Sequence, residues 1–481
     1  MSFNRRDFLK NSFIGAGILS TGIVSCTDSG DKAGRSPVVG NHKQSFNMCG
    51  YGAPKLETVR VGFIGLGMRG PGAVQRFSHL EGVEIAALCD ISEERVANAQ
   101  KILEKQGLPP AKPFFGSDDA WKSLCENPDI DLVYICTPWE YHTPMAVYAM
   151  ENGKHSATEV PAALTVDEAW QLVEVSERTR KHCMMLENCC YDFFELLTLN
   201  LARQGFFGEI VHGEGAYIHD LLDLNFDKNG YTGMWRLREN MRQGNLYPTH
   251  GLGPVCQIMN INRGDQMEYL TSMQSADFMM ASHAEKLAST DDFYKEFVGK
   301  GYRGNMNTTL VRTIKGRSIM IQHDVTSPRP YSRIHLVSGT KAFASKWPSP
   351  ARIAQGHGWI SNEELKNLEE QYTPEIVKHV GDIARQIGGH GGMDFMMDWR
   401  LVDCLRNGLP LDQDVYDAAL WSVILPLSTE SVANRSNSVD VPDFTCGAWK
   451  TNIPVDTTLN GGGTTGVKTA DQKSASQQLS V

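Results

Sequence analysis

The 481-residue sequence has no excess of basic residues and no basic stripe along any segment. Lys and Arg number 46 against 56 Asp and Glu, which gives a formal net charge of −10. Because binding to a phosphate backbone depends on clustered positive charge, nucleic acid is not an expected partner. The composition is otherwise that of an ordinary soluble globular protein, and the length predicts two or more domains.

The eleven cysteines lack the paired spacing of a metal site. Most fall in apolar, strand-like runs, among them Cys89, Cys136 and Cys183. A disulfide framework is not expected in a chain that can bury so large a core. We therefore expect buried free thiols and no metal.

The sequence also lacks a convincing membrane span, since its N-terminal apolar run, Phe13 to Val24, is short and glycine-rich. The preceding Asn4-Arg5-Arg6-Asp7-Phe8-Leu9-Lys10 resembles a twin-arginine export signal, and Ile23-Val24-Ser25-Cys26 resembles a lipobox. We interpret residues 1–26 as an export signal with a lipobox; the alternatives are an uncleaved signal and a frayed helix. The protein is then exported and held at the membrane only by a lipid on Cys26.

A glycine turn follows the first strong strand pattern. The apolar run from Val59 to Ile64 stops at Gly65-Leu66-Gly67-Met68-Arg69-Gly70, and a second strand pattern ends at Asp90. Strand, glycines and acid in this order are typical of a dinucleotide-binding unit. A carboxylate at Asp90 favours NAD over NADP, whereas Arg69 in the same loop can also meet a phosphate. The alternative is a glycine-rich loop of an unrelated α/β protein.

Strand and helix patterns then alternate as far as Asn188. Such alternation predicts a doubly wound parallel sheet of the Rossmann type, whose ligand lies at the carboxyl ends of the strands. Three of those ends carry polar clusters, Thr137 to His142, Glu159 to Pro161 and Asn188. A helix cap is the alternative for His142, and a simple turn is the alternative for Pro161.

Beyond Asn188 the pattern changes to alternating strands, several of them without helices between them. This predicts an α+β domain with an open, mainly antiparallel sheet. Helices at 393–406 and 415–433 are expected to pack back against the first domain. The predicted organisation is a linker at 27–57, a Rossmann domain at 58–188, a substrate-binding domain at 189–453 and a flexible tail at 454–481.

This combination resembles a known family. A Rossmann domain, an open antiparallel sheet and Glu159-Val160-Pro161 at a strand exit are similar to the glucose-fructose oxidoreductase, inositol dehydrogenase and MocA family, which usually has lysine where Val160 stands. The segments at 139–142, 159–160, 188 and 247–250 resemble one branch, the NAD-dependent α-N-acetylgalactosaminidases of glycoside hydrolase family 109.

The resemblance implies two sets of site residues. NAD would contact the glycine turn, Gly65, Gly67 and Gly70, together with Met68, Arg69, Asp90, Trp139, Glu140, Tyr141, His142, Glu159, Val160, Asn188 and Tyr247. The sugar would contact Tyr217, Arg236, Tyr247, Pro248, Thr249, His250 and Tyr331. Without the family pattern, an outward-facing strand aromatic is the plain interpretation of Tyr217, and a satisfied loop histidine that of His250.

The hypothesis that follows is a glycosidase acting on terminal N-acetylgalactosamine of glycans. Oxidation at C3 of the sugar makes the C2 proton acidic, the aglycone is eliminated, water adds at C1 and C3 is reduced again, outside the two-carboxylate scheme. His250 and Tyr247 are the candidates for proton transfer, and their roles stay undivided. A recycled cofactor suits an exported protein, because the cell exterior offers no NAD pool.

Two competing hypotheses remain. An exported sugar oxidoreductase of the glucose-fructose type would yield net oxidised product. A surface sugar-binding lipoprotein would have a vestigial Rossmann site. The sequence leaves open whether the chain forms a homo-oligomer.

Overall fold

The structure is a computed structural model, and it describes residues 42–468. The predicted export signal and lipobox at 1–26 lie outside the described residues, as does the predicted tail beyond Lys468. Among the helices of residues 42–468, none has the length and apolar character needed to cross a membrane.

The first half of the described chain builds a parallel sheet with the strand order β3-β2-β1-β4-β5-β6. β4 and β5 are buried along their whole length, as expected when helices cover both faces. The order reverses at β1 and β4, which is the doubly wound arrangement that the sequence predicts. Its elements are β1 (Val59–Ile64), α2 (Gly70–Phe77), β2 (Val83–Cys89), α3 (Glu93–Lys105), β3 (Lys112–Phe114), α4 (Ala120–Glu126), β4 (Leu132–Ile135), α5 (His142–Glu151), β5 (His155–Thr158), α6 (Val166–Thr179) and β6 (Cys183–Met185).

The second half builds a mixed sheet with the order β14-β13-β12-β11-β7-β10-β9-β8-β15 within the described residues. Only β7 and β10 pair in parallel there, so the prediction of a mainly antiparallel sheet is confirmed. Its strands are β7 (Ile210–Ile218), β8 (Met267–Gln274), β9 (Asn307–Thr313), β10 (Ser318–Asp324), β11 (His335–Gly339), β12 (Ala342–Lys346), β13 (Arg352–Gln355), β14 (Gly358–Trp359) and β15 (Val439–Asp440).

The helices of this half fall into two groups. Those before β11 are α7 (Phe193–Arg203), α8 (Leu222–Phe226), α9 (Trp235–Glu239), α10 (Thr249–Met259) and α11 (Met280–Ala288). Those after β14 are α12 (Asn362–Tyr372), α13 (Glu375–Ile387), α14 (Met393–Asn407), α15 (Val415–Ser422) and α16 (Ile424–Ala433).

Helix α10 lies unusually close to strand β7. A Cβ added to Gly251 would lie 2.1 Å from the backbone nitrogen of Ala216, and one added to Gly215 would lie 2.4 Å from the backbone of Gly251. Only glycine allows two backbones to approach this closely. The first turn of α10, which carries His250, is thereby fixed beside Tyr217 on β7.

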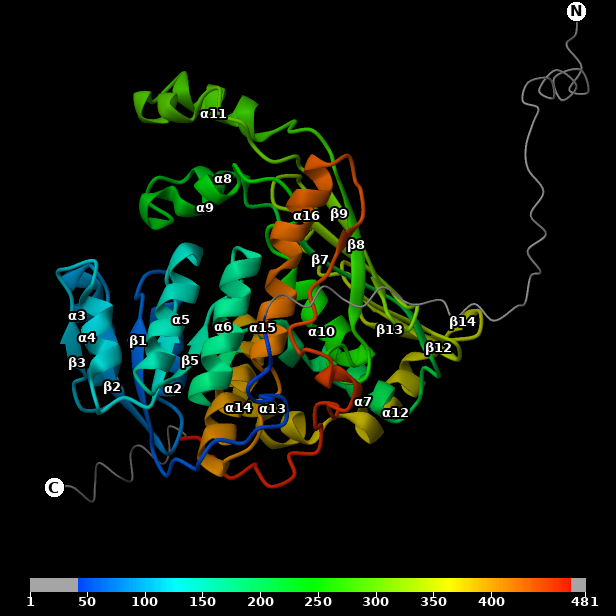
Figure 1. Cartoon of the computed structure of the whole chain (residues 1–481), viewed down its shortest axis with the longest axis horizontal. Helices are drawn as coiled ribbons and strands as arrows, with labels where there is room; N and C mark the ends of the chain where they lie inside the picture. Colours follow the sequence, from blue (N-terminus) through cyan, green and yellow to red (C-terminus); the bar gives the residue numbers. More distant parts are fainter. Residues whose placement is uncertain (1–41, 469–481) are drawn as a thin grey trace, which may run out of the picture. The chain divides into compact units, whose positions relative to one another are not determined.

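The late helices pack against the parallel sheet, as the sequence predicts. α14 contacts α2 and β1, and α15 contacts α6 and β6; Figure 1 shows α15 beside α6. The single helix predicted over 415–433 is wrong, because the structure has α15 and α16 with a break at Val423. Pro426 explains the break, since its ring lacks an N–H and would clash with the carbonyl of Ser422 in a continuous helix.

Two segments predicted as loose are packed where the structure describes them. In the predicted linker, His42 lies 3.0 Å from Glu177, Gln44 donates to the Tyr416 hydroxyl at 2.8 Å, and Met48 is buried. In the predicted tail, Leu80 forms a β-bridge with Val467. Polar, glycine-rich segments can thus be held by hydrogen bonds to buried partners instead of by apolar burial.

The ten cysteines within the described residues are free, and seven of them are buried, which confirms the expectation of buried thiols there. They are Cys49, Cys89, Cys125, Cys136, Cys183, Cys189, Cys190, Cys256, Cys404 and Cys446.

Candidate functional site

The glycine turn has the geometry of a dinucleotide cradle. Gly65 has φ +88°, and the N–H of Leu66 donates to the Asp90 carboxylate at 2.7 Å. A Cβ on Gly70 would lie 2.1 Å from the carbonyl oxygen of Gly65, whereas a Cβ on Gly67 would meet no atom closer than 3.8 Å. Gly70 therefore serves the contact between helix and turn, and Gly67 leaves open the space that a pyrophosphate needs. The residues present fit NAD.

A cavity of about 1120 Å³ runs from this turn to the second sheet. The strand exits of the parallel sheet form one end, and residues of β7, α9 and α10 form the other. Most of the predicted site residues line it: Gly65, Gly67, Met68, Arg69, Asp90, Trp139, Glu140, Tyr141, His142, Glu159, Val160, Asn188, Tyr217, Arg236, Tyr247 and His250.

Four predicted residues do not line the cavity. Gly70 lies in the helix contact described above, and Pro248 and Thr249 are buried at the start of α10. Tyr331 stands behind Tyr217, with ring centroids 6.4 Å apart and edge to face. These four residues lie next to residues that face the cavity.

His142 lines the cavity but is fully buried, and both ring nitrogens face backbone carbonyls. Nδ1 lies 2.7 Å from the oxygen of Pro161, and Nε2 lies 2.8 Å from the oxygen of Thr137. The imidazole thus joins the exits of β4 and β5, and the helix cap that the sequence offered as the alternative is wrong, because the ring contacts two loop carbonyls and no N–H of α5.

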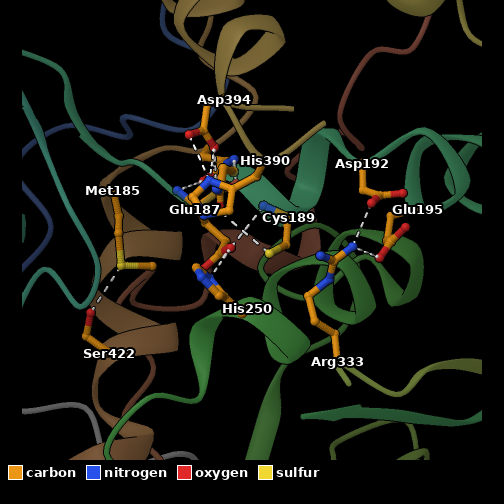
Figure 2. Close-up of polar contacts among 12 residues, drawn as sticks. Met185, Glu187, Cys189, Asp192, Glu195, His250, Arg333, His390, Asp394 and Ser422 are labelled. Carbon is orange, nitrogen blue, oxygen red and sulfur yellow. Dashed lines mark hydrogen bonds and ion pairs between the residues drawn. The ribbon is translucent and has the colours of Figure 1, made fainter. Parts of the chain in front are cut away.

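A charged network closes the cofactor end of the cavity. Arg69 donates to Glu159 at 2.9 Å and lies 3.4 Å from Asp394, whose other oxygen accepts from Asn188. His390 lies 2.9 Å from the same Asp394 (Figure 2). Burial opposes the charge of Asp394, but His390 and Arg69 together lower its pKa below the usual range.

Sequence reasoning missed Asp394 and His390. The only signal was the run Gly388-Gly389-His390-Gly391-Gly392, in which the glycines and His390 all have positive φ. These conformations bring His390, which is about half exposed, to the cavity wall.

Aromatic rings and one guanidinium form the opposite end. Tyr247 stacks on Trp139 with centroids 5.6 Å apart, and the Arg236 guanidinium lies 5.1 Å from the Tyr247 ring. Arg236 also donates to the Tyr231 hydroxyl at 2.9 Å. Burial raises the pKa of Tyr217 and raises that of Tyr247 far above its usual value, so both phenols keep their protons at neutral pH and can donate hydrogen bonds.

Nδ1 of His219 lies 3.1 Å from the hydroxyl of Tyr217, and the ring of His250 lies close to both phenols. Its centroid lies 4.8 Å from that of Tyr247 and 5.4 Å from that of Tyr217. Nδ1 of His250 lies 2.8 Å from Oε1 of Glu187, as Figure 2 shows. Sequence reasoning missed Glu187, which precedes Asn188 at the end of β6 and is fully buried.

Glu187, Cys189 and His250 also place possible metal-ligand atoms within 4.8 Å of one another. Nδ1 of the histidine is already engaged by the carboxylate. Burial raises the pKa of the Cys189 thiol far above its usual range, so the thiol keeps its proton. A metal needs the thiolate, and we assign no metal here.

Solved structures share the fold of this chain. Levoglucosan dehydrogenase in complex with NADH and levoglucosan has a TM-score of 0.59 at 17% identity, over 80% of this chain and 100% of that one. An NAD binding oxidoreductase from Klebsiella pneumoniae has a TM-score of 0.60 at 17% identity, over 80% of this chain and 100% of that one. At these identities the likeness shows the fold alone. The model of the oxidoreductase family with an NAD-binding Rossmann fold matches residues 59–187, and the cofactor is NAD.

The second half identifies the branch. The model of the glycosyl hydrolase 109 C-terminal domain matches residues 191–451. "Glycosyl hydrolase family 109 protein 1" of Bacteroides fragilis is 51% identical over 420 residues, 84% of this chain and 89% of that protein. "Alpha-N-acetylgalactosaminidase" of the same species is 52% identical over 410 residues, 84% of this chain and 96% of that protein. The chain belongs to glycosyl hydrolase family 109.

Proposed function

We propose that the protein is an exported α-N-acetylgalactosaminidase that recycles its NAD within each turnover. The observation that carries the proposal is one cavity with a dinucleotide cradle at one end and His250, Tyr247, Tyr217 and Arg236 at the other. The Bacteroides fragilis relative named alpha-N-acetylgalactosaminidase supports the substrate.

NAD⁺, when bound, supplies a hydride acceptor for C3 of the sugar. The cradle of Gly65, Gly67 and Asp90 would hold the dinucleotide, while Arg69, Glu159 and Asn188 form the charged wall beside it. Val160 stands where related dehydrogenases carry lysine, and it is buried and has no proton to exchange. Proton transfer therefore falls to the other end of the cavity.

At that end the chain offers an acceptor and donors. His250 can take the proton of the sugar hydroxyl, and the phenols of Tyr217 and Tyr247 can donate hydrogen bonds to sugar oxygens. Arg236 offers a fixed fork of donors and, being positive, supports negative charge that develops on the sugar during elimination of the aglycone. Stacked aromatic faces around it exclude water from the bound ring.

Incubation with p-nitrophenyl α-N-acetylgalactosaminide in deuterated water tests this proposal. Elimination predicts release of nitrophenol together with deuterium at C2 of the product, and no net oxidation of the sugar. Release without label would show direct displacement instead. Accumulation of an oxidised sugar would favour the glucose-fructose type of oxidoreductase, and no release at all would leave a sugar-binding protein.

The location is part of the proposal. Arg5-Arg6 and Ile23 to Cys26 support twin-arginine export followed by lipidation of Cys26, and folding around NAD before export would explain that route. Mass spectrometry of the membrane-bound protein should find Cys26 as the acylated first residue. A soluble mature protein that keeps residues 1–25 would contradict it.

A further inference from the structure

We propose that Glu187 is the positioning residue that makes His250 the proton acceptor, by holding the imidazole in the tautomer whose Nε2 faces the cavity. The inference deepens the proposed function and rests on it. It divides roles that the sequence leaves undivided between His250 and Tyr247.

The carboxylate is aimed at one ring nitrogen. Nδ1 of His250 lies 2.8 Å from Oε1 and 3.0 Å from Oε2 of Glu187. Glu187 is fully buried, while the side chain of His250 is 13% exposed and lines the cavity. Within residues 42–468, no group forms a hydrogen bond with Nε2. One nitrogen is therefore committed to the protein, and the other is free for a ligand.

Glu187 is itself held firmly. Its Oε1 accepts from the N–H of Cys189 at 3.1 Å, and its backbone carbonyl accepts from the Gln413 amide at 2.9 Å. His250 sits on the first turn of α10, whose backbone is pressed against β7 at Gly251. Both partners thus come from rigid elements of different halves of the chain, which is what a precise orientation requires.

The charge state fixes the direction of the hydrogen bond. Burial raises the pKa of Glu187, but the facing His250 and the neighbouring donors outweigh burial and lower it. An ionised carboxylate only accepts, so Nδ1 carries the hydrogen and the lone pair of the neutral ring stays on Nε2. Cys189, Tyr217 and Tyr247 beside the ring have raised pKa values and stay neutral, and burial and Arg236 lower the pKa of the nearby His219.

The proton balance follows. The sugar O3–H bond breaks and its proton joins Nε2, which gives an imidazolium next to the buried carboxylate. The carboxylate stabilises that cation without taking the proton, and the proton returns to O3 when C3 is reduced. Tyr247 keeps its own proton and acts as a hydrogen-bond donor.

The test uses Glu187→Gln in the full-length protein loaded with NAD. A glutamine amide can donate to Nδ1, which moves the hydrogen to Nε2 and removes the acceptor. We expect kcat to fall on the order of 10²- to 10⁴-fold, the range for loss of a general base, with KM, bound NAD and Tm little changed.

Glu177→Gln is the matched control. Glu177 is a second buried glutamate paired with a histidine, His42 at 3.0 Å, and it does not line the cavity. Its replacement should leave kcat unchanged. If Glu187→Gln behaved like this control, the inference would be overturned.

A second measurement does not depend on turnover or on the variant's folding. ¹⁵N spectra of histidine-labelled wild-type protein, assigned with His250→Asn, should show the neutral ring with its hydrogen on Nδ1 and none on Nε2. A neutral ring with its hydrogen on Nε2 would overturn the inference. If the wild type released no nitrophenol, the proposed function would fail, and these spectra would still decide whether Glu187 sets the tautomer.

Discussion

At the scale of single residues, two glycines of one turn have different tasks. Gly67 faces the open cavity, and Gly70 faces the carbonyl of Gly65 at a distance that no side chain can share. The first is then a requirement of the cofactor and the second a requirement of the fold.

Substituting alanine separates these tasks. Gly67→Ala should leave the free energy of unfolding of the NAD-free protein within about 1 kcal/mol of wild type, since the added methyl group enters empty space. The same substitution should weaken NAD binding about tenfold or more. Gly70→Ala should instead lower Tm in the absence of NAD. Calorimetry of both variants, with and without NAD, checks this, and equal behaviour of the two would contradict the division.

Much of the site could be predicted residue by residue, and its supports could not. Asp90, Tyr217, Arg236, Tyr247 and His250 carry chemistry recognisable from residue type and family pattern, and all line the cavity. Glu187 and Asp394 acquire their roles only through partners far along the chain, His250 and Asn188. A single sequence holds no signal for such pairings.

At the scale of elements, an ionic cluster joins helix α7 to β12 and to the residues just before β11 of the second sheet. Arg333 donates to Asp192 and to Glu195 at 2.7 Å each, as Figure 2 shows, and Lys346 of β12 bonds Asp192 as well. Burial opposes the charge of Glu195, but Arg333 and Lys346 lower its pKa to about 2. The pKa of Asp192 is raised, because burial and the neighbouring Glu195 both disfavour its charged form.

The sign of the resulting pH dependence follows from the lowered pKa. Glu195 stabilises the fold fully above its unfolded pKa of 4.5, and this contribution is lost as pH falls from there towards 2. Glu195→Gln should therefore lower the free energy of unfolding at pH 7 by roughly 3–5 kcal/mol and flatten its fall between those pH values. Urea unfolding across this range measures it. Glu363→Gln, at an exposed position, is the control. If the free energy of unfolding of Glu195→Gln fell with pH as steeply as that of wild type, Glu195 would not be the source of this pH dependence.

Element prediction depends on local chemistry that marks where an element begins. Ser92 caps α3 by accepting from the Arg95 N–H, and Thr165 and Glu168 form a capping box on α6. It failed for β12, β13 and β14, which are short strands at the sheet edge whose pairing, and not their composition, makes them strands.

At the scale of the whole molecule, the end of the described chain returns to the Rossmann unit. Asp403, fully buried on α14, accepts from the backbone N–H groups of Gly463, Thr464 and Thr465. Trp399 donates to the carbonyl of Thr465 at 2.9 Å. Polar, glycine-rich sequence can supply such backbone donors without a hydrophobic pattern, which is why composition alone predicts a tail here.

Truncation tests the importance of this segment. Removal of residues 461–481 would leave the Asp403 carboxylate without those donors, and charge-assisted hydrogen bonds contribute roughly 1.5–3 kcal/mol each. We expect a Tm lower by several degrees, measured by calorimetry. Removal of residues 469–481 alone keeps every contact named above and should leave Tm unchanged; equal Tm for both truncations would contradict the expectation.

The position of α14 and α15 has a further consequence for protein engineering. Both helices come late in the chain. They nevertheless pack against β1 and β6 of the parallel sheet and against its helices α2 and α6, and so shield them from water. A gene truncated after residue 188 would encode a nucleotide-binding fragment whose apolar surface, covered by α14 and α15 in the whole protein, is exposed to water. We expect this fragment to aggregate. Grafting this half onto another sugar-binding half would need to carry those two helices with it.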